Sequence, residues 1–208
     1  MAFKENKMSS TQLLQDMMRQ YCRPSSVYPD IKKKLREVLT QLSDQQKLHI
    51  LQQDYTTRPL HRAARRDDTE IISTLLTSLQ SSADRLKLLM VDDEYTPLHR
   101  AALMGHTESV KMILDCLTAD QQIQIMSVQD WGDETAIQCA ESIRRTDTVR
   151  VLREYQHRAE SLMKEEYSKL MIIIPLLLII MAGVMRTLME LTILFLANRY
   201  SQWLLTTP

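Results

Sequence analysis

The sequence predicts an all-α protein, a stack of repeated helix pairs followed by a long apolar helix. The segment PLHRAA begins at Pro59 and again 38 residues later at Pro97. Glycine and proline are scarce, with 3 and 6 among 208 residues, which favours helices over a turn-rich sheet. A run of 16 uncharged residues begins at Leu170. A repeat of this length is typical of a stacked array, in which each unit buries its apolar face against its neighbours.

Two helices are expected before the repeats. Residues 11–22 and 31–42 place apolar side chains at helical spacing, and residues 23–29 hold two prolines that favour a connection. Residues 1–10 are expected to be disordered. Because part of this region aligns loosely with a later repeat, we predict that residues 1–42 are a degenerate repeat that caps the stack.

Each repeat in residues 43–155 has four parts: a lead-in segment, a turn and two short helices. The first helix opens with Pro-Leu-His and the second with Thr-Glu or Thr-Asp. The third copy, Glu134 to Leu152, is the most diverged. The lead-in segments are residues 43–54, 82–93 and 118–130.

This unit resembles the ankyrin repeat, whose signature Thr-Pro-Leu-His-x-Ala is intact from Thr96 to Ala101. Thr96 is expected to cap the first helix, and Pro97 suits its first turn. Gly105 suits a left-handed helix end, and Thr107 is expected to cap the second helix. The resemblance implies a helical solenoid that binds proteins through its turn tips and the concave face lined by first helices. It also implies that His61, His99 and His106 have structural roles as hydrogen-bonding residues of the loops.

The repeats depart from the family pattern in several places. Each copy is about five residues longer than the usual ankyrin period of about 33. The extra residues fall in the lead-in, which is expected to be either a lengthened second helix or an added short helix. Asp67 and Arg144 stand where glycine is favoured, and Arg58 replaces the motif threonine. Ala136 and Gln138 replace the motif proline and histidine in the third copy, which we expect to be the C-terminal cap.

The apolar tail is expected to cross a bilayer once, as a transmembrane helix within residues 170–196. A crossing needs about 20 apolar residues, and Arg186 and Glu190 are the only charged side chains in this segment. They lie at i and i+4, so they can form an intramembrane polar pair. The apolar residues outweigh the cost of about 2.5–3.5 kcal/mol for each charge at mid-bilayer. Residues 156–169 are expected to form a charged helical connector, and residues 197–208 a short tail.

Basic residues predict the orientation of this span. Only Arg199 follows it, whereas four basic residues precede it: Arg153, Arg158, Lys164 and Lys169. The positive-inside rule therefore places the N-terminal repeats in the cytosol, as in a single-pass, tail-anchored protein. Two alternatives remain for the tail, a hairpin that turns between residues 183 and 187 and a long helix buried in a soluble oligomer.

Charge and motifs argue against several other classes of protein. Lys plus Arg and Asp plus Glu both number 26, so the chain lacks the excess of basic residues typical of nucleic-acid binders. The sequence contains no metal-ligand motif, phosphate loop or nucleophile elbow. We therefore expect no enzyme, no cofactor, no metal and no small-molecule substrate. Cys22, Cys116 and Cys139 are expected to be buried or free thiols in a reducing compartment.

These features predict a membrane-anchored ankyrin-repeat adaptor that binds another protein. Exposed aromatic residues in the turns are common binding hot spots. Arginines at the ends of first helices would form a basic strip that suits an acidic partner segment. The candidate partner-binding residues are Tyr55, Tyr95, Trp131, Arg62, Arg65, Arg66, Arg100, Met104, Arg144 and Arg145. The alternative for these residues is that the arginines are merely solvated and the tyrosines pack locally.

The alternative function is a subunit or fragment of an ankyrin-bearing channel or transport assembly that oligomerises through its membrane segment. An ankyrin-bearing palmitoyltransferase would need an Asp-His-His-Cys motif, which the sequence lacks. A bacterial or host-directed effector is a third alternative.

Overall fold

The computed structural model of the chain describes residues 9–23, 29–53, 58–90 and 95–206. Within these ranges it contains eleven helices and no strand, apart from an isolated antiparallel bridge between Gln129 and Thr135. The predicted all-α fold is therefore confirmed. The chain divides into two compact units, Met1–Ser161 and Leu162–Pro208.

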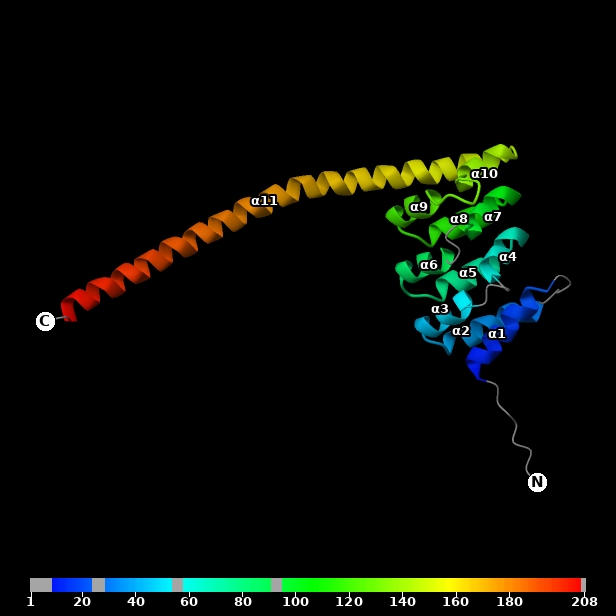
Figure 1. The fold of residues 1–208 in the computed structure, drawn as a ribbon, viewed down its shortest axis with the longest axis horizontal. Helices are drawn as coiled ribbons and strands as arrows, with labels where there is room; N and C mark the ends of the chain where they lie inside the picture. Colours follow the sequence, from blue (N-terminus) through cyan, green and yellow to red (C-terminus); the bar gives the residue numbers. More distant parts are fainter. Residues whose placement is uncertain (1–8, 24–28, 54–57, 91–94, 207–208) are drawn as a thin grey trace, which may run out of the picture. The chain divides into compact units, whose positions relative to one another are not determined.

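The first unit is a stack of helix triads (Figure 1). The first triad is α1 (Ser10–Tyr21), α2 (Pro29–Thr40) and α3 (Asp44–Gln53). The second is α4 (Pro59–Arg66), α5 (Thr69–Thr77) and α6 (Ser82–Leu89). The third is α7 (Pro97–Met104), α8 (Thr107–Asp115) and α9 (Ala119–Met126), and α10 (Ala136–Ser142) and α11 (Thr146–Thr206) follow. Three columns of helices result, because α4, α7 and α10 pack in succession, as do α2, α5 and α8, and α3, α6 and α9.

The residues that lengthen each repeat form an added short helix, and the second helix is not lengthened. The chain leaves α5 at Ser78, and α6 begins only after Ser81. Thr118 likewise starts α9 afresh with a capping box that it shares with Gln121. The structure thus decides between the two alternatives for the lead-in segment.

Two of the added helices, α3 and α6, bind the next repeat through a cationic side chain. Lys47 of α3 donates from Nζ to the carbonyl oxygen of Ser78, at a distance of 2.7 Å. Arg85 of α6 donates from Nη1 to the carbonyl oxygen of Cys116, at 3.1 Å. Ser78 and Cys116 are the C-terminal caps of α5 and α8. A positive charge at a helix C-terminus is favourable, because the last carbonyl groups there have no partner within the helix.

The start of α7 confirms the expected cap. The Thr96 hydroxyl accepts a hydrogen bond from the backbone N–H of His99, and Pro97 occupies the first turn. Gly105 ends α7 in the left-handed region, with φ of 80°. Asp67 and Arg144 take the same conformation after α4 and α10, with φ of 56° and 57°, although L-residues with a side chain rarely do so.

The expected cap at Thr107 is wrong. Helix α8 begins at Thr107 itself, and its N-cap residue is His106, which makes no capping bond from its side chain. A residue in the first helical position has helical backbone angles, so it cannot take the non-helical conformation of an N-cap. The imidazole Nε2 of His106 instead lies 3.1 Å from the carbonyl oxygen of Arg65, in the preceding repeat. Glu108 does supply the expected acid in the first turn of α8.

Small residues allow the first helices to approach closely. Ala63 and Ala64 of α4, Ala101 and Ala102 of α7, and Ala140 of α10 are all fully buried. Leucine and isoleucine side chains of the second helices, such as Ile72 and Leu114, belong to one continuous core that also includes apolar residues of the first and added helices.

The second unit is helical throughout its described residues and belongs to α11. By length and composition, α11 is the one helix in the described chain that could cross a membrane. Its most apolar window has a mean hydropathy of 2.4, and none of that window is buried within the structure. Pro175 lies inside this helix without ending it.

We expect Arg85→Met to lower the free energy of unfolding of the full chain by about 2 kcal/mol. The substitution removes charge-assisted hydrogen bonds to carbonyl oxygens at the ends of two helices. Urea unfolding in detergent micelles, followed by circular dichroism, measures the change. Lys87→Met is the matched control in the same helix, because Lys87 is exposed and pairs with Asp84. Its expected effect is less than about 1 kcal/mol, and equal losses in the two variants would contradict the role assigned to Arg85.

Candidate functional site

Tyr95, the predicted hot spot before α7, is half-buried in a small cluster. Its ring stacks on that of His99 with centroids 5.6 Å apart, and the guanidinium of Arg100 lies 4.7 Å from its centroid. Its carbonyl oxygen lies 2.6 Å from Nε2 of His61 in the preceding repeat. Burial raises the pKa of the Tyr95 hydroxyl. Tyr95 and Arg100 therefore lie together, and only part of the tyrosine ring is open to a partner.

Trp131 is 77% exposed and lies in the turn between α9 and α10. Asp130 fixes this turn, because its Oδ1 accepts hydrogen bonds from the backbone N–H groups of Gly132 and Glu134, at 2.8 and 3.1 Å. Burial opposes ionisation of Asp130, but these bonds outweigh it and lower the pKa of the carboxyl. Burial and the nearby Asp130 carboxylate raise the pKa of the Cys139 thiol to about 12. The structure thus presents a large aromatic side chain on an ordered turn.

The predicted residues on first helices differ in what they contact. Arg66 donates to the carbonyl oxygens of Tyr21 and Arg23, both at 3.0 Å, so it ties α4 to α1. Arg65 is exposed, while Arg62 and Met104 are half-buried. The remaining candidate, Tyr55, lies outside the described residues.

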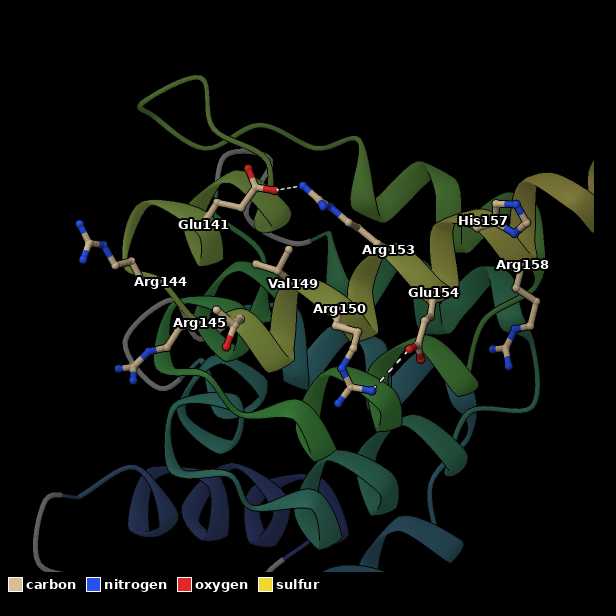
Figure 2. A pocket seen from close by; sticks show the side chains of 10 residues that line it. Glu141, Arg144, Arg145, Val149, Arg150, Arg153, Glu154, His157 and Arg158 are labelled. Carbon is tan, nitrogen blue, oxygen red and sulfur yellow. Dashed lines mark hydrogen bonds and ion pairs between the residues drawn. The ribbon is translucent and has the colours of Figure 1, made fainter.

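An open groove of about 940 Å³ runs along the end of α10 and the first turns of α11 (Figure 2). Five arginines line this arginine groove, namely Arg144, Arg145, Arg150, Arg153 and Arg158. The other charged side chains that line it are Glu141 and Glu154. Of the predicted partner-binding residues that the structure describes, Arg144 and Arg145 belong to this lining.

Local folding explains why these arginines line one groove. On one side, α11 buries Val151, Leu152 and Ala159. Arg150 and Arg153 are spaced three residues apart and lie on the exposed side. Gly105 leaves room for the Arg145 side chain, because a Cβ atom at Gly105 would lie 2.9 Å from the Arg145 Cδ.

The acidic side chains of the groove are already paired. Glu141 accepts from Arg153 at 2.6 Å, and Glu154 lies 3.6 Å from Arg150 (Figure 2). Arg144 and Arg145 have no ion pair within the described residues. The groove therefore carries an excess of positive charge, and its guanidinium groups can bind carboxylates through paired hydrogen bonds.

Sequence reasoning found Arg144 and Arg145 but missed the contributions of Arg150, Arg153 and Arg158 to this groove. The available signal was the helical spacing of basic residues directly after the Arg-Arg pair. The position of these arginines along one groove also depends on the left-handed turn at Arg144, which directs the chain from α10 into α11.

A family model described as ankyrin repeats matches the chain, with three copies, over residues 31–125 and 60–165. The matched region includes the Trp131 turn and the whole arginine groove. A comparison with curated proteins gives no match.

We expect the stability of the repeats to fall as pH drops below about 6.5, the value for an unperturbed histidine. Burial lowers the pKa of His99, so the folded protein keeps this side chain neutral while the unfolded chain binds a proton. The stability that neutral His99 contributes is fully present above about pH 6.5 and is lost progressively as the pH falls below that value. Urea unfolding at about pH 7.5 and about pH 5.5 measures the difference.

The matched variant is His99→Gln, because Gln138 stands at the same position in the third repeat and accepts from the backbone N–H of Thr135 at 2.8 Å. This variant is expected to keep the helix cap and to weaken the pH dependence. His157→Gln is the control, because it removes an exposed histidine and should leave the pH dependence of unfolding unchanged. An unchanged pH dependence in His99→Gln would show that another group causes it.

Proposed function

This chain belongs to the ankyrin-repeat family, and we propose that it is a membrane-anchored adaptor whose repeats bind an acidic segment of another protein. Ankyrin repeats are protein–protein interaction modules. The fold is typically non-enzymatic, and we propose no catalytic role. The apolar part of α11 would hold the repeats at a membrane.

The arginine groove is the observation that carries the proposed partner chemistry. Its two glutamates pair with arginines of the groove itself. An incoming carboxylate would therefore meet Arg144 and Arg145 without first displacing an ion pair. Complementary charge favours both encounter and specificity. The exposed Trp131 adds an aromatic side chain of the kind that is enriched in binding hot spots.

The composition of residues 170–196 supports the proposed anchor. At about 1.5 Å per residue, a helix of this length is longer than the hydrocarbon core of about 30 Å. Its apolar side chains are exposed throughout the structure, from Leu170 at 48% to Leu196 at 64%. A bilayer would remove this surface from water. The basic residues before the span favour repeats on the cytosolic side.

We expect a fluorescent oligoglutamate peptide to bind the full chain in nanodiscs, more weakly as salt rises. Arg144→Glu with Arg145→Glu should weaken this binding by about tenfold or more, because like charges then face the peptide. Fluorescence anisotropy measures both affinities.

The control for that experiment is Arg36→Glu with Lys111→Glu, which changes net charge equally at two exposed positions of α2 and α8. This control should retain most of the affinity. Equal weakening in both double variants would mean that the peptide senses only net charge, and would contradict a binding site in the groove.

We expect the full chain in microsomal membranes to resist extraction by alkaline carbonate. Leu178→Arg with Met181→Arg should release it, since each arginine at mid-bilayer costs about 2.5–3.5 kcal/mol. The matched control, Ser161→Arg with Ser168→Arg, adds the same two positive charges before the apolar segment and should remain resistant. Extraction of the unaltered chain would contradict the anchor.

A further inference from the structure

Arg186 and Glu190 form an ion pair along one face of the apolar helix. The Arg186 Nε donates to Oε1 of Glu190 at 3.2 Å. Neither side chain is covered, because they are 83% and 61% exposed. A hollow of about 590 Å³ beside them is lined otherwise by Met185, Leu188, Met189, Thr192 and Ile193. The pair therefore sits among side chains that are apolar apart from the Thr192 hydroxyl.

The pair within one helix leaves polar atoms without partners. A guanidinium group has five N–H donors, and the recorded bond uses the Nε donor. Within the described part of the apolar unit, Nη1 and Nη2 of Arg186 and Oε2 of Glu190 make no hydrogen bond. Hydrocarbon offers no hydrogen bonds, so unpaired polar groups are costly there. A partner that supplied both a donor and an acceptor would satisfy them.

We propose that this helix associates with a second copy of the chain, and that Arg186 of each copy donates to Glu190 of the other. The proposal rests on the proposed membrane crossing, since copies inserted in the same direction lie parallel. Each copy then presents a cation and an anion one helical turn apart, about 6 Å along the axis. In a parallel pair the two cations lie at one level and the two anions at the next, so each cation reaches the other copy's anion diagonally, one turn along the axis.

The shape of the same face permits this contact. A Cβ atom at Gly183 would have nothing within 4 Å, and Thr187 follows one turn later. At 3.6 residues per turn, Gly183 and Thr187 lie on the same side of the helix as Arg186 and Glu190. Small residues at such spacing allow helices in a bilayer to approach closely, and they are common at helix interfaces. Close approach brings the two ion pairs within reach of each other.

The experiment uses full chains with two different affinity tags, co-expressed in microsomal membranes. After solubilisation in a mild detergent, one tag is captured and the other is quantified. One variant, Arg186→Glu, carries two acids on the face, and another, Glu190→Arg, carries two bases. Each variant paired with itself should lose about tenfold in capture, whereas the mixed pair should recover the capture of the unaltered chain. An ion pair confined to one helix gives no such recovery, because neither variant can form it.

Three results would overturn the proposal: no self-capture by the unaltered chain, self-capture of the two variants equal to that of the unaltered chain, or a mixed pair that captures no better than either variant alone. Alkaline extraction of the same membranes keeps this test separate from that of the anchor, because an anchored chain without self-capture contradicts only the proposed association. Should either charge variant fail to insert, Arg186→Gln and Glu190→Gln replace them. Loss of self-capture in both then supports the pairing, and retention overturns it.

Discussion

The stack depends on apolar burial between successive repeats, because a triad of short helices cannot bury its own apolar face alone. Fully buried alanines make that burial efficient. Ala63 and Ala64 lie between α4 and its neighbours, and Ala101 and Ala102 repeat the arrangement in α7. Without larger side chains between them, the first helices approach closely. The apolar side chains of the first, second and added helices then form one continuous core.

The long repeat period has a structural cause in the added helices α3, α6 and α9. Two of them carry a cation that reaches a helix end in the next repeat, Lys47 to Ser78 and Arg85 to Cys116. Both donors and both acceptors are 38 positions apart, so the contact recurs with the sequence repeat. The extra residues therefore add a second kind of connection between repeats, electrostatic rather than apolar, where helix carbonyls would otherwise lack partners.

Much of the fold could be predicted from the sequence, because its signals are local. The Thr96 cap and the left-handed Gly105 each depend on a few adjacent residues, and the phase of the repeats follows from short motifs that recur 38 residues apart. The sequence did not decide whether the lead-in was a separate helix, because that depends on caps such as Thr118 that compete with continuation of the preceding helix. The cap expected at Thr107 was wrong by one position, because threonine is a common N-cap residue whereas His106, which takes that position, contacts the preceding repeat instead.

The candidate site was less predictable for a related reason. Arg144 and Arg145 were visible as a basic pair, but the arginine groove also needs Arg150 and Arg153, whose place depends on how α11 leaves α10. Arg66 resembled the other exposed arginines in the sequence, whereas its guanidinium binds backbone carbonyls of the first triad. Helical spacing predicts which residues share a face, but it does not predict which of them another repeat will engage.

We propose that one apolar helix crosses a bilayer once and leaves the repeats in the cytosol, where the arginine groove can bind its partner. Glycosylation mapping tests this most directly, with acceptor sites added before Met1 and after Pro208 in separate full-length chains translated with microsomes. A single crossing with cytosolic repeats gives glycosylation only at the acceptor after Pro208. Glycosylation at the acceptor before Met1, or at neither acceptor in a chain that resists alkaline extraction, would contradict it.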